Sequence, residues 1–169
     1  MEKRPSKDKY YLNITKEISR RSTCFRTKFG AIIVKDDTII STGYVGAPRK
    51  TKDCLERGNC LRRELNIPHG QRYELCRSVH SEQNAIINAA RSGVSVLGGD
   101  MFLHCEVVEG KARDAFPCFM CKKMIINAGI NRVICSSEDG KYKVFNVQDW
   151  VKDWQERDMF EDKEQYEKK

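Results

Sequence analysis

The chain has 169 residues, of which 40% are hydrophobic and 33% are charged, and its formal net charge is +7. This is the composition of a globular domain, and its apolar runs are far shorter than the roughly 20 residues that a membrane-spanning helix needs. The N-terminal residues lack the apolar core of a secretory signal, so we expect a cytoplasmic protein. The positive charge suits a nucleic acid, an anionic nucleotide or solubility alone, and excludes none of them.

The first half of the chain begins with regular elements and then becomes irregular. Apolar residues at helical spacing predict an amphipathic helix over 7–21. Two β-branched runs, 31–34 and 38–42, indicate a hairpin. Residues 43–79 are polar and interrupted by Gly and Pro. A loop of this length in a compact domain is usually functional or held by a ligand.

The second half alternates between helices and strands. The expected elements are helix 80–91, strand 101–105, helix 118–128, strand 132–135 and a C-terminal helix at about 147–165. Such alternation predicts an α/β domain with helices packed on a mixed sheet. With no repeat or linker in the sequence, we expect a single domain over 1–169, with its core at about 10–140.

Eight cysteines in a chain of this size favour metal ligation or thiol chemistry over a disulfide framework. The motif His80-Ser81-Glu82 opens one predicted helix, and Cys118 and Cys121 open another. One imidazole and two thiolates are an open zinc site, with the fourth position left for water. Zinc lowers the pKa of such a water, and Glu82 can carry its proton. The sequence therefore predicts a hydrolytic zinc centre with Glu82 as the catalytic residue.

Two other interpretations of these motifs are open. The site could be a closed structural zinc site or a buried pair of thiols, with Glu82 as an acid in the first turn of a helix. Alternatively, Cys118 and Cys121 could form a thioredoxin-like redox pair. The redox interpretation leaves both His80 and Glu82 unexplained.

Beyond these motifs, several blocks resemble the zinc-dependent cytidine deaminase superfamily and, within it, the deoxycytidylate (dCMP) deaminases. The blocks are residues 29–34, 41–49, 76–86 and 128–130, in family order. The resemblance implies a three-layer fold with a central mixed sheet of about five strands and helices on both faces. It also implies hydrolytic deamination of dCMP to dUMP, a precursor of thymidylate.

The resemblance extends to candidate substrate contacts. Asn84 and Arg91 match positions that face the substrate in deoxycytidylate deaminases. Arg26 and Arg49 are further candidates, because guanidinium groups bind phosphate oxygens in a fixed fork. This chain has Val45 where many family members have Asn, which puts a sugar or phosphate contact from that loop in doubt.

Some deoxycytidylate deaminases carry a second, structural zinc, and this chain resembles them in its irregular region. Any four of five residues could be its ligands: Cys24, Cys54, Cys60, His69 and Cys76. A closed site of four ligands would hold a loop that lacks a core. Alternatively, several of these thiols are buried packing residues, as we expect for Cys105 and Cys135.

The leading hypothesis is thus a dCMP deaminase with one catalytic zinc, a nucleotide substrate and no membrane contact. The resemblance also implies a homo-oligomer, with dCTP and dTTP as effectors. One alternative is a deaminase that acts on a nucleoside or on a base within RNA or DNA, although no stretch interleaves aromatic with basic residues. A non-enzymatic alternative is a nucleic-acid-binding module organised by zinc.

Overall fold

The computed structural model describes residues 4–68 and 70–158. The helices are α1 (Lys7–Ser19), α2 (Cys54–Arg57), α3 (Leu61–Glu64), the 3₁₀ helix η1 (Tyr73–Leu75), α4 (Ser81–Arg91), α5 (Phe119–Asn127) and α6 (Val147–Glu156). The strands are β1 (Thr27–Lys35), β2 (Thr38–Tyr44), β3 (Asp100–Val107), β4 (Ala112–Arg113), β5 (Arg132–Ser136) and β6 (Tyr142–Asn146).

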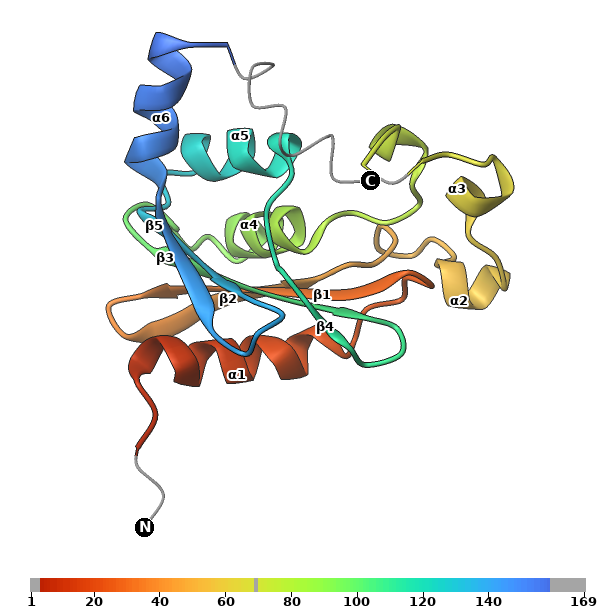
Figure 1. The fold of residues 1–169 in the computed structure, drawn as a ribbon, viewed down its shortest axis with the longest axis horizontal. Coiled ribbons are helices and arrows are strands. Elements are labelled where there is room, and N and C mark those ends of the chain that lie inside the picture. Colours follow the sequence, from red (N-terminus) through yellow and green to blue (C-terminus); the bar gives the residue numbers. More distant parts are fainter. Residues whose placement is uncertain (1–3, 69, 159–169) are drawn as a thin grey trace.

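The strands form one mixed sheet in the order β2-β1-β3-β5-β6, with β4 paired to β3. β3 and β5 are parallel, and the other neighbours are antiparallel. Helix α1 covers one face of the sheet, whereas α4 and α5 lie on the other (Figure 1). The predicted three-layer arrangement of five main strands between helices is confirmed.

The core is divided by the sheet into two apolar clusters. In β1, Ala31 and Ile33 belong to the cluster on the α4 and α5 side, and Ile32 and Val34 to the cluster on the α1 side. Successive side chains of a strand point to opposite faces, so a central strand that is covered on both sides is apolar at every position. This explains the uninterrupted run over 31–34.

Helix α4 is fixed to β2 by backbone proximity and by side-chain hydrogen bonds. A Cβ atom at Gly43 would lie 2.2 Å from the carbonyl oxygen of Ser81, so only glycine permits this approach. Ser41 Oγ donates to the carbonyl oxygen of Ala85 at 2.6 Å, and Asn88 Nδ2 donates to that of Thr42 at 2.8 Å. The start of α4 therefore has a defined position over the sheet.

Some elements differ from the sequence-based prediction. β6 was not expected, because it is an edge strand with mostly exposed or half-buried side chains and no apolar run. The short helices α2, α3 and η1 lie within the predicted irregular stretch. The C-terminal helix ends at Glu156, and residues 159–165 of its predicted span lie outside the described residues. No helix in the described ranges has the length and apolar character to cross a membrane.

Candidate metal centre and active site

Two helix starts bring the predicted ligands together. His80 is the N-cap of α4, and its backbone N–H donates to Gln83 Oε1 at 3.0 Å. Cys118 is the N-cap of α5, and Cys121 lies in the first turn of that helix. Both helices start at the end of the molecule where the α2 and α3 segment lies (Figure 1). Exposed N–H groups and the helix dipole at such a position favour thiolates.

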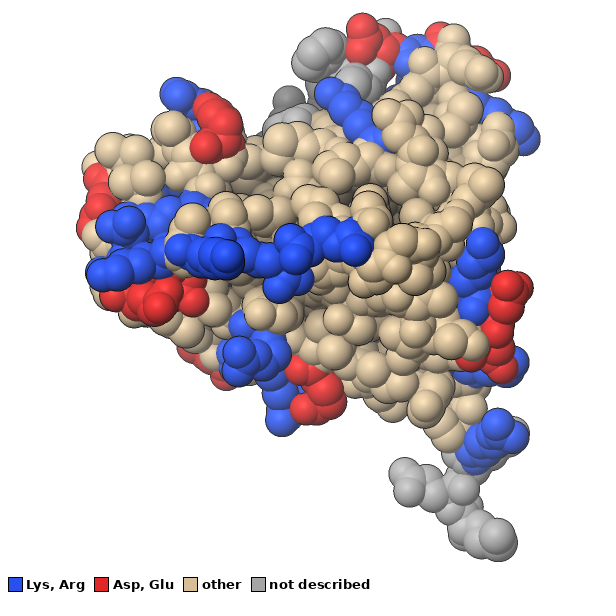
Figure 2. Space-filling view, turned by 180° about the vertical axis from the view of Figure 1, so that it is seen from behind, with Lys and Arg blue, Asp and Glu red and all other residues tan. Residues whose placement is uncertain are grey.

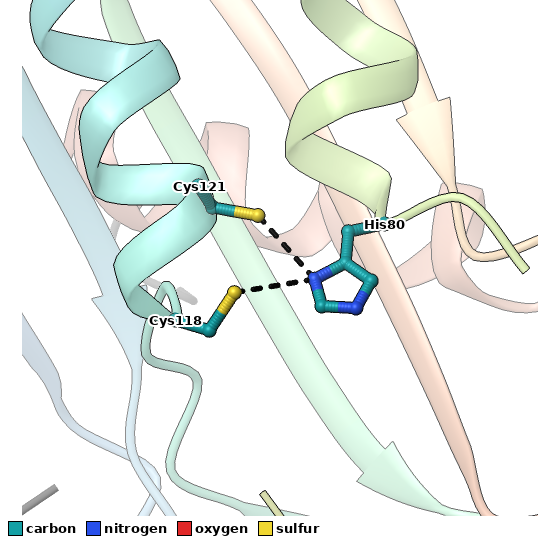
Figure 3. A group of neighbouring side chains, drawn as sticks. All are labelled: His80, Cys118 and Cys121. Carbon is teal, nitrogen blue, oxygen red and sulfur yellow. Dashed lines mark hydrogen bonds between the residues drawn. The ribbon is translucent and has the colours of Figure 1, made fainter. Parts of the chain in front are cut away.

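The three side chains converge on one point. Cys118 Sγ lies 3.4 Å and Cys121 Sγ lies 3.3 Å from Nδ1 of His80. Figure 3 shows both sulfur atoms directed at this nitrogen, and all three ligand atoms lie within 4.8 Å of one another. Zn–S and Zn–N bonds of ordinary length at a tetrahedral angle separate sulfur from nitrogen by roughly 3.6 Å. The residues therefore fit a zinc ion bound through Nδ1.

The surroundings of these three side chains shift their pKa values in different directions. A hydrogen bond from Cys121 lowers the pKa of the Cys118 thiol to about 4, and the contact with His80 acts in the same direction. The bond to Cys118 and burial raise the pKa of Cys121. Burial lowers the pKa of His80, but the hydrogen bond to Cys118 and the charge of Glu82 outweigh it and raise the net value. The pair thus shares one proton in a site prepared for a cation.

Glu82 is buried beside the three ligands. It is 3% exposed, and one carboxylate oxygen accepts a hydrogen bond from Ser81 Oγ at 2.9 Å. Burial raises its pKa, and the neighbouring Cys118 adds to this effect, whereas His80 opposes it. A carboxyl group with a raised pKa next to a metal site can both accept and return a proton near neutral pH.

The predicted substrate contacts are spread along α4 and its neighbours. Asn84 Nδ2 donates to the carbonyl oxygen of Tyr44 at 2.8 Å, close to His80. Arg26 is half-buried just before β1. Arg49 Nη2 donates to Asn88 Oδ1 at 2.7 Å, in the second half of α4. Arg91 is the exposed last residue of this helix, about 15 Å from its start, so the structure does not bring it to the metal ligands.

The cysteines of the irregular region do not converge as the catalytic ligands do. Cys54 is buried, and this burial raises the pKa of its thiol. A hydrogen bond with Arg77 opposes the increase, and the neighbouring Cys24 and Cys60 add to it. Among the described residues, His80 with Cys118 and Cys121 is the one group that meets the ligand distance. His69 lies outside the described residues.

The other two cysteines belong to the core. Cys105 and Cys135 are 3% and 1% exposed and pack in the cluster under α4 and α5. Burial raises the pKa of Cys105 to about 12 and also raises that of Cys135, so both thiols stay protonated at neutral pH.

Two neighbours of the site were missed by the sequence analysis. The ring of Tyr73 lies edge-to-face against the His80 ring, and the guanidinium of Arg62 lies over the Tyr73 ring. The charge of Arg62 opposes protonation of His80. Both residues come from the irregular stretch, where no periodicity indicates which side chains point inwards.

The fold and the site together define a cytidine deaminase-like domain with one His/Cys/Cys centre. Residues 5–137 match the family model for the cytidine and deoxycytidylate deaminase zinc-binding region. The chain therefore belongs to this family.

Similar proteins include two named deoxycytidylate deaminases. The one from Mycobacterium phage D29 is 33% identical over 140 residues, which cover 80% of this chain and 98% of that protein. The one from Schizosaccharomyces pombe is 32% identical over 131 residues, which cover 78% of this chain and 37% of that protein. The chain thus spans little more than a third of this yeast relative.

Solved structures agree on the fold. The dCMP deaminase from cyanophage S-TIM5, in complex with dCMP and dUMP, has a TM-score of 0.55 and 26% identity, covering 78% of this chain and 82% of that one. A cytidine deaminase from Burkholderia pseudomallei has a TM-score of 0.55 at 16% identity, with 82% of this chain and 91% of that one covered. The second likeness concerns the fold alone.

Proposed function

We propose that this protein is a zinc-dependent deaminase that converts dCMP and water into dUMP and ammonia. The observation that carries the proposal is the buried carboxyl group of Glu82 beside the convergent side chains of His80, Cys118 and Cys121. A structural zinc site needs a fourth ligand and no proton carrier, whereas a hydrolytic site needs an open position and a general base.

The residues divide the chemistry between them. His80, Cys118 and Cys121 would hold zinc, which when bound lowers the pKa of water and makes a nucleophile near pH 7. The Glu82 carboxylate accepts a proton from the attacking water and delivers it to the ring nitrogen of cytosine. It then accepts the second proton, from the hydroxyl group now on C4, and passes it to the amino group, which leaves as ammonia when the C4–N bond breaks. Burial of Glu82 keeps bulk water from competing for that proton.

Arg26 is the first candidate for the phosphate contact. The backbone N–H of Thr23 donates to the carbonyl oxygen of Val45, and Gly46 pairs with Val79 next to His80. The segment that carries Arg26 is thereby tied to the same end of the molecule as the metal ligands. Asn84 would contact the nucleoside part of the substrate. The further candidates are Arg49, which donates to Asn88 in the second half of α4, and Arg91, the last residue of that helix.

The decisive experiment compares ammonia release from dCMP, deoxycytidine and a cytosine-containing oligonucleotide. One or two charge-assisted contacts should favour dCMP over deoxycytidine by roughly tenfold to several thousandfold in kcat/KM. The oligonucleotide tests the alternative substrate class, because Lys and Arg side chains form a band across the face seen in Figure 2. Equal efficiency on dCMP and deoxycytidine would overturn the proposed substrate.

Variants of the arginines locate the phosphate contact. Arg26→Ala should lower kcat/KM for dCMP by roughly tenfold or more and leave deoxycytidine unchanged. Arg91→Ala tests a further candidate at the far end of α4, and Arg20→Ala is the matched control, because it removes an exposed arginine that follows α1 on the other face of the sheet. A loss that is equal for both substrates would indicate a structural role for the side chain.

We further propose a second, structural zinc in the irregular region, with ligands drawn from Cys24, Cys54, Cys60, His69 and Cys76. The contributions of Cys24 and Cys60 to the raised pKa of the Cys54 thiol support it, because they act only between neighbouring groups. The purified protein should then contain close to two zinc ions per chain, and Cys54→Ser should remove one and lower the melting temperature. A single zinc that depends only on His80, Cys118 and Cys121 would contradict this proposal.

The remaining proposals concern assembly and regulation. A homo-oligomer and responses to dCTP and dTTP follow from the family likeness and not from any contact in the chain. Light scattering on the purified protein gives its mass in solution. Initial rates at subsaturating dCMP, with and without each triphosphate, show whether dCTP activates and dTTP inhibits.

A further inference from the structure

Arg62, in the short helix α3, is a buried cation that forms no ion pair within the described residues, although its charge contributes to the lowered pKa of Glu74. The residue is 6% exposed. Its Nη2 donates to the carbonyl oxygens of Pro68 and Gln71 at 2.9 and 2.5 Å. Its Nε is buried and has no hydrogen-bond partner among the residues that the structure describes. Burying a guanidinium group with an unsatisfied N–H costs free energy, so another contact of this side chain must offset part of that cost.

That contact is with an aromatic ring. The central carbon of the Arg62 guanidinium lies 4.9 Å from the centroid of the Tyr73 ring. A desolvated cation over the face of a tyrosine is attracted by the negative face of the ring. Since Arg62 is also bonded to the carbonyl groups of Pro68 and Gln71, it fixes Tyr73 relative to these two residues.

The Tyr73 ring in turn contacts a metal ligand. Its centroid lies 4.9 Å from that of His80, and the two ring planes meet at 87°, an edge-to-face geometry. The Nδ1 atom of His80 faces the two thiols. A ligating histidine usually has its other nitrogen fixed by a hydrogen bond, but Nε2 of His80 has no such bond to the described residues. Tyr73 is therefore the neighbour that limits rotation of this imidazole.

We propose that Tyr73, fixed by Arg62, is a positioning residue for His80, so that the short helices α3 and η1 set the orientation of the imidazole and the retention of the metal. The inference rests on the proposed function in one respect, because it takes His80 to be a zinc ligand. It adds a link between the polar segment and the metal centre that is independent of the substrate.

The first test measures zinc release from the holoenzyme to a chromogenic chelator. Tyr73→Leu keeps apolar bulk but removes the ring edge, and should accelerate release by roughly twofold to tenfold, as expected for loss of one aromatic pair. Tyr73→Phe keeps the ring and should release zinc at the rate of the unmodified protein. The visible spectrum of the cobalt-substituted protein should change in Tyr73→Leu and not in Tyr73→Phe, because it reports ligand geometry.

The second test acts on the cation. Arg62→Ala should accelerate zinc release as Tyr73→Leu does, and Arg62→Lys should restore part of the retention, because it returns a cation to the ring face. The matched control is Arg63→Ala, which removes an exposed arginine of the same short helix. If Tyr73→Leu does not fold, the comparison of Arg62→Ala with Arg62→Lys decides the question.

The outcomes separate this inference from the proposed function. Unchanged zinc release and cobalt spectrum in folded Tyr73→Leu, or equal acceleration in Arg63→Ala, would overturn the positioning role. If the unmodified protein deaminates neither dCMP nor deoxycytidine while Tyr73→Leu releases zinc faster, the proposed function fails and the positioning role stands. Faster release in Tyr73→Leu and Arg62→Ala, with retention in Tyr73→Phe, supports it.

Discussion

The two sides of the metal centre are built in different ways. His80, Cys118 and Cys121 come from the ends of helices that lie on a buried sheet, and Gly43 allows backbone contact between β2 and α4. The neighbouring 46–79 segment has short helices and exposed apolar side chains such as Leu55 and is linked by polar contacts. The positions of the metal ligands thus depend on core packing. The position of the 46–79 segment depends on hydrogen bonds, which can change without disrupting the core.

The largest expected effect lies at the packed side. Glu82→Gln should lower turnover by roughly 10²- to 10⁴-fold, because an amide cannot accept and return the proton. The zinc content should stay unchanged, since Glu82 is not a ligand. Ammonia release and metal analysis on the same sample check both expectations. Activity close to that of the unmodified protein would remove Glu82 from its assigned role.

The contact between β2 and α4 can be broken directly. In Gly43→Ala, the added Cβ would lie 2.2 Å from the Ser81 carbonyl oxygen and 2.4 Å from the Ala85 nitrogen. Neither atom belongs to a flexible side chain, so α4 must shift, at a cost of about 3 kcal/mol. The melting temperature should fall by roughly 6–12 °C, and zinc retention should weaken because His80 moves with the helix. Unchanged stability would show that this contact is looser than the structure indicates.

A third change probes the opposite face of the sheet. Glu106 Oε1 lies 3.1 Å from both His104 Nε2 and Lys16 Nζ, and its side chain is 8% exposed. Burial raises the pKa of Glu106, but His104 and Lys16 outweigh it and keep the pKa below its ordinary value. Its stabilisation is therefore present above pH 4.5 and is lost as the pH falls through the lowered pKa.

Glu106→Gln should accordingly lower the free energy of unfolding by about 1–3 kcal/mol at pH 7, and the difference from the unmodified protein should shrink below about pH 4.5. Burial also lowers the pKa of His104, so the unmodified protein should lose stability as the pH falls below 6.5. Urea unfolding from pH 7 down to about pH 3 measures both trends. A difference that does not vary with pH would contradict an ionised Glu106.

The smallest effect is expected in the polar segment. Gly58 ends α2 with φ at +71° and has no atom within 4 Å of an added Cβ. Gly58→Ala should therefore cost only the strain of the left-handed conformation, about 1 kcal/mol, and lower the melting temperature by roughly 2–4 °C. Turnover should be unchanged. A loss as large as that of Gly43→Ala would show that the two regions do not differ as the structure suggests.

Much of this protein could be predicted from the sequence because its signals are local. The spacing of His80 from Glu82 and of Cys118 from Cys121 predicted one metal site at two helix starts, and the structure brings His80, Cys118 and Cys121 together. The β-branched runs over 31–34 and 38–42 predicted a hairpin, and β1 and β2 pair as antiparallel neighbours. Such patterns follow from the geometry of a single helix or strand, so no long-range contact is needed to recognise them.

Tertiary structure alone decided what surrounds that site. Nothing in the spacing of Arg62 and Tyr73 relates them to His80, and their contact exists only because the irregular segment folds back to the start of α4. β6 has five residues, all exposed or half-buried, and it forms a strand by pairing with the edge of β5. Arg91 is on the same helix as the metal ligand, yet the length of that helix separates the two. Side chains from aperiodic segments and edge strands take their positions from distant partners, and one-dimensional spacing does not record those partners.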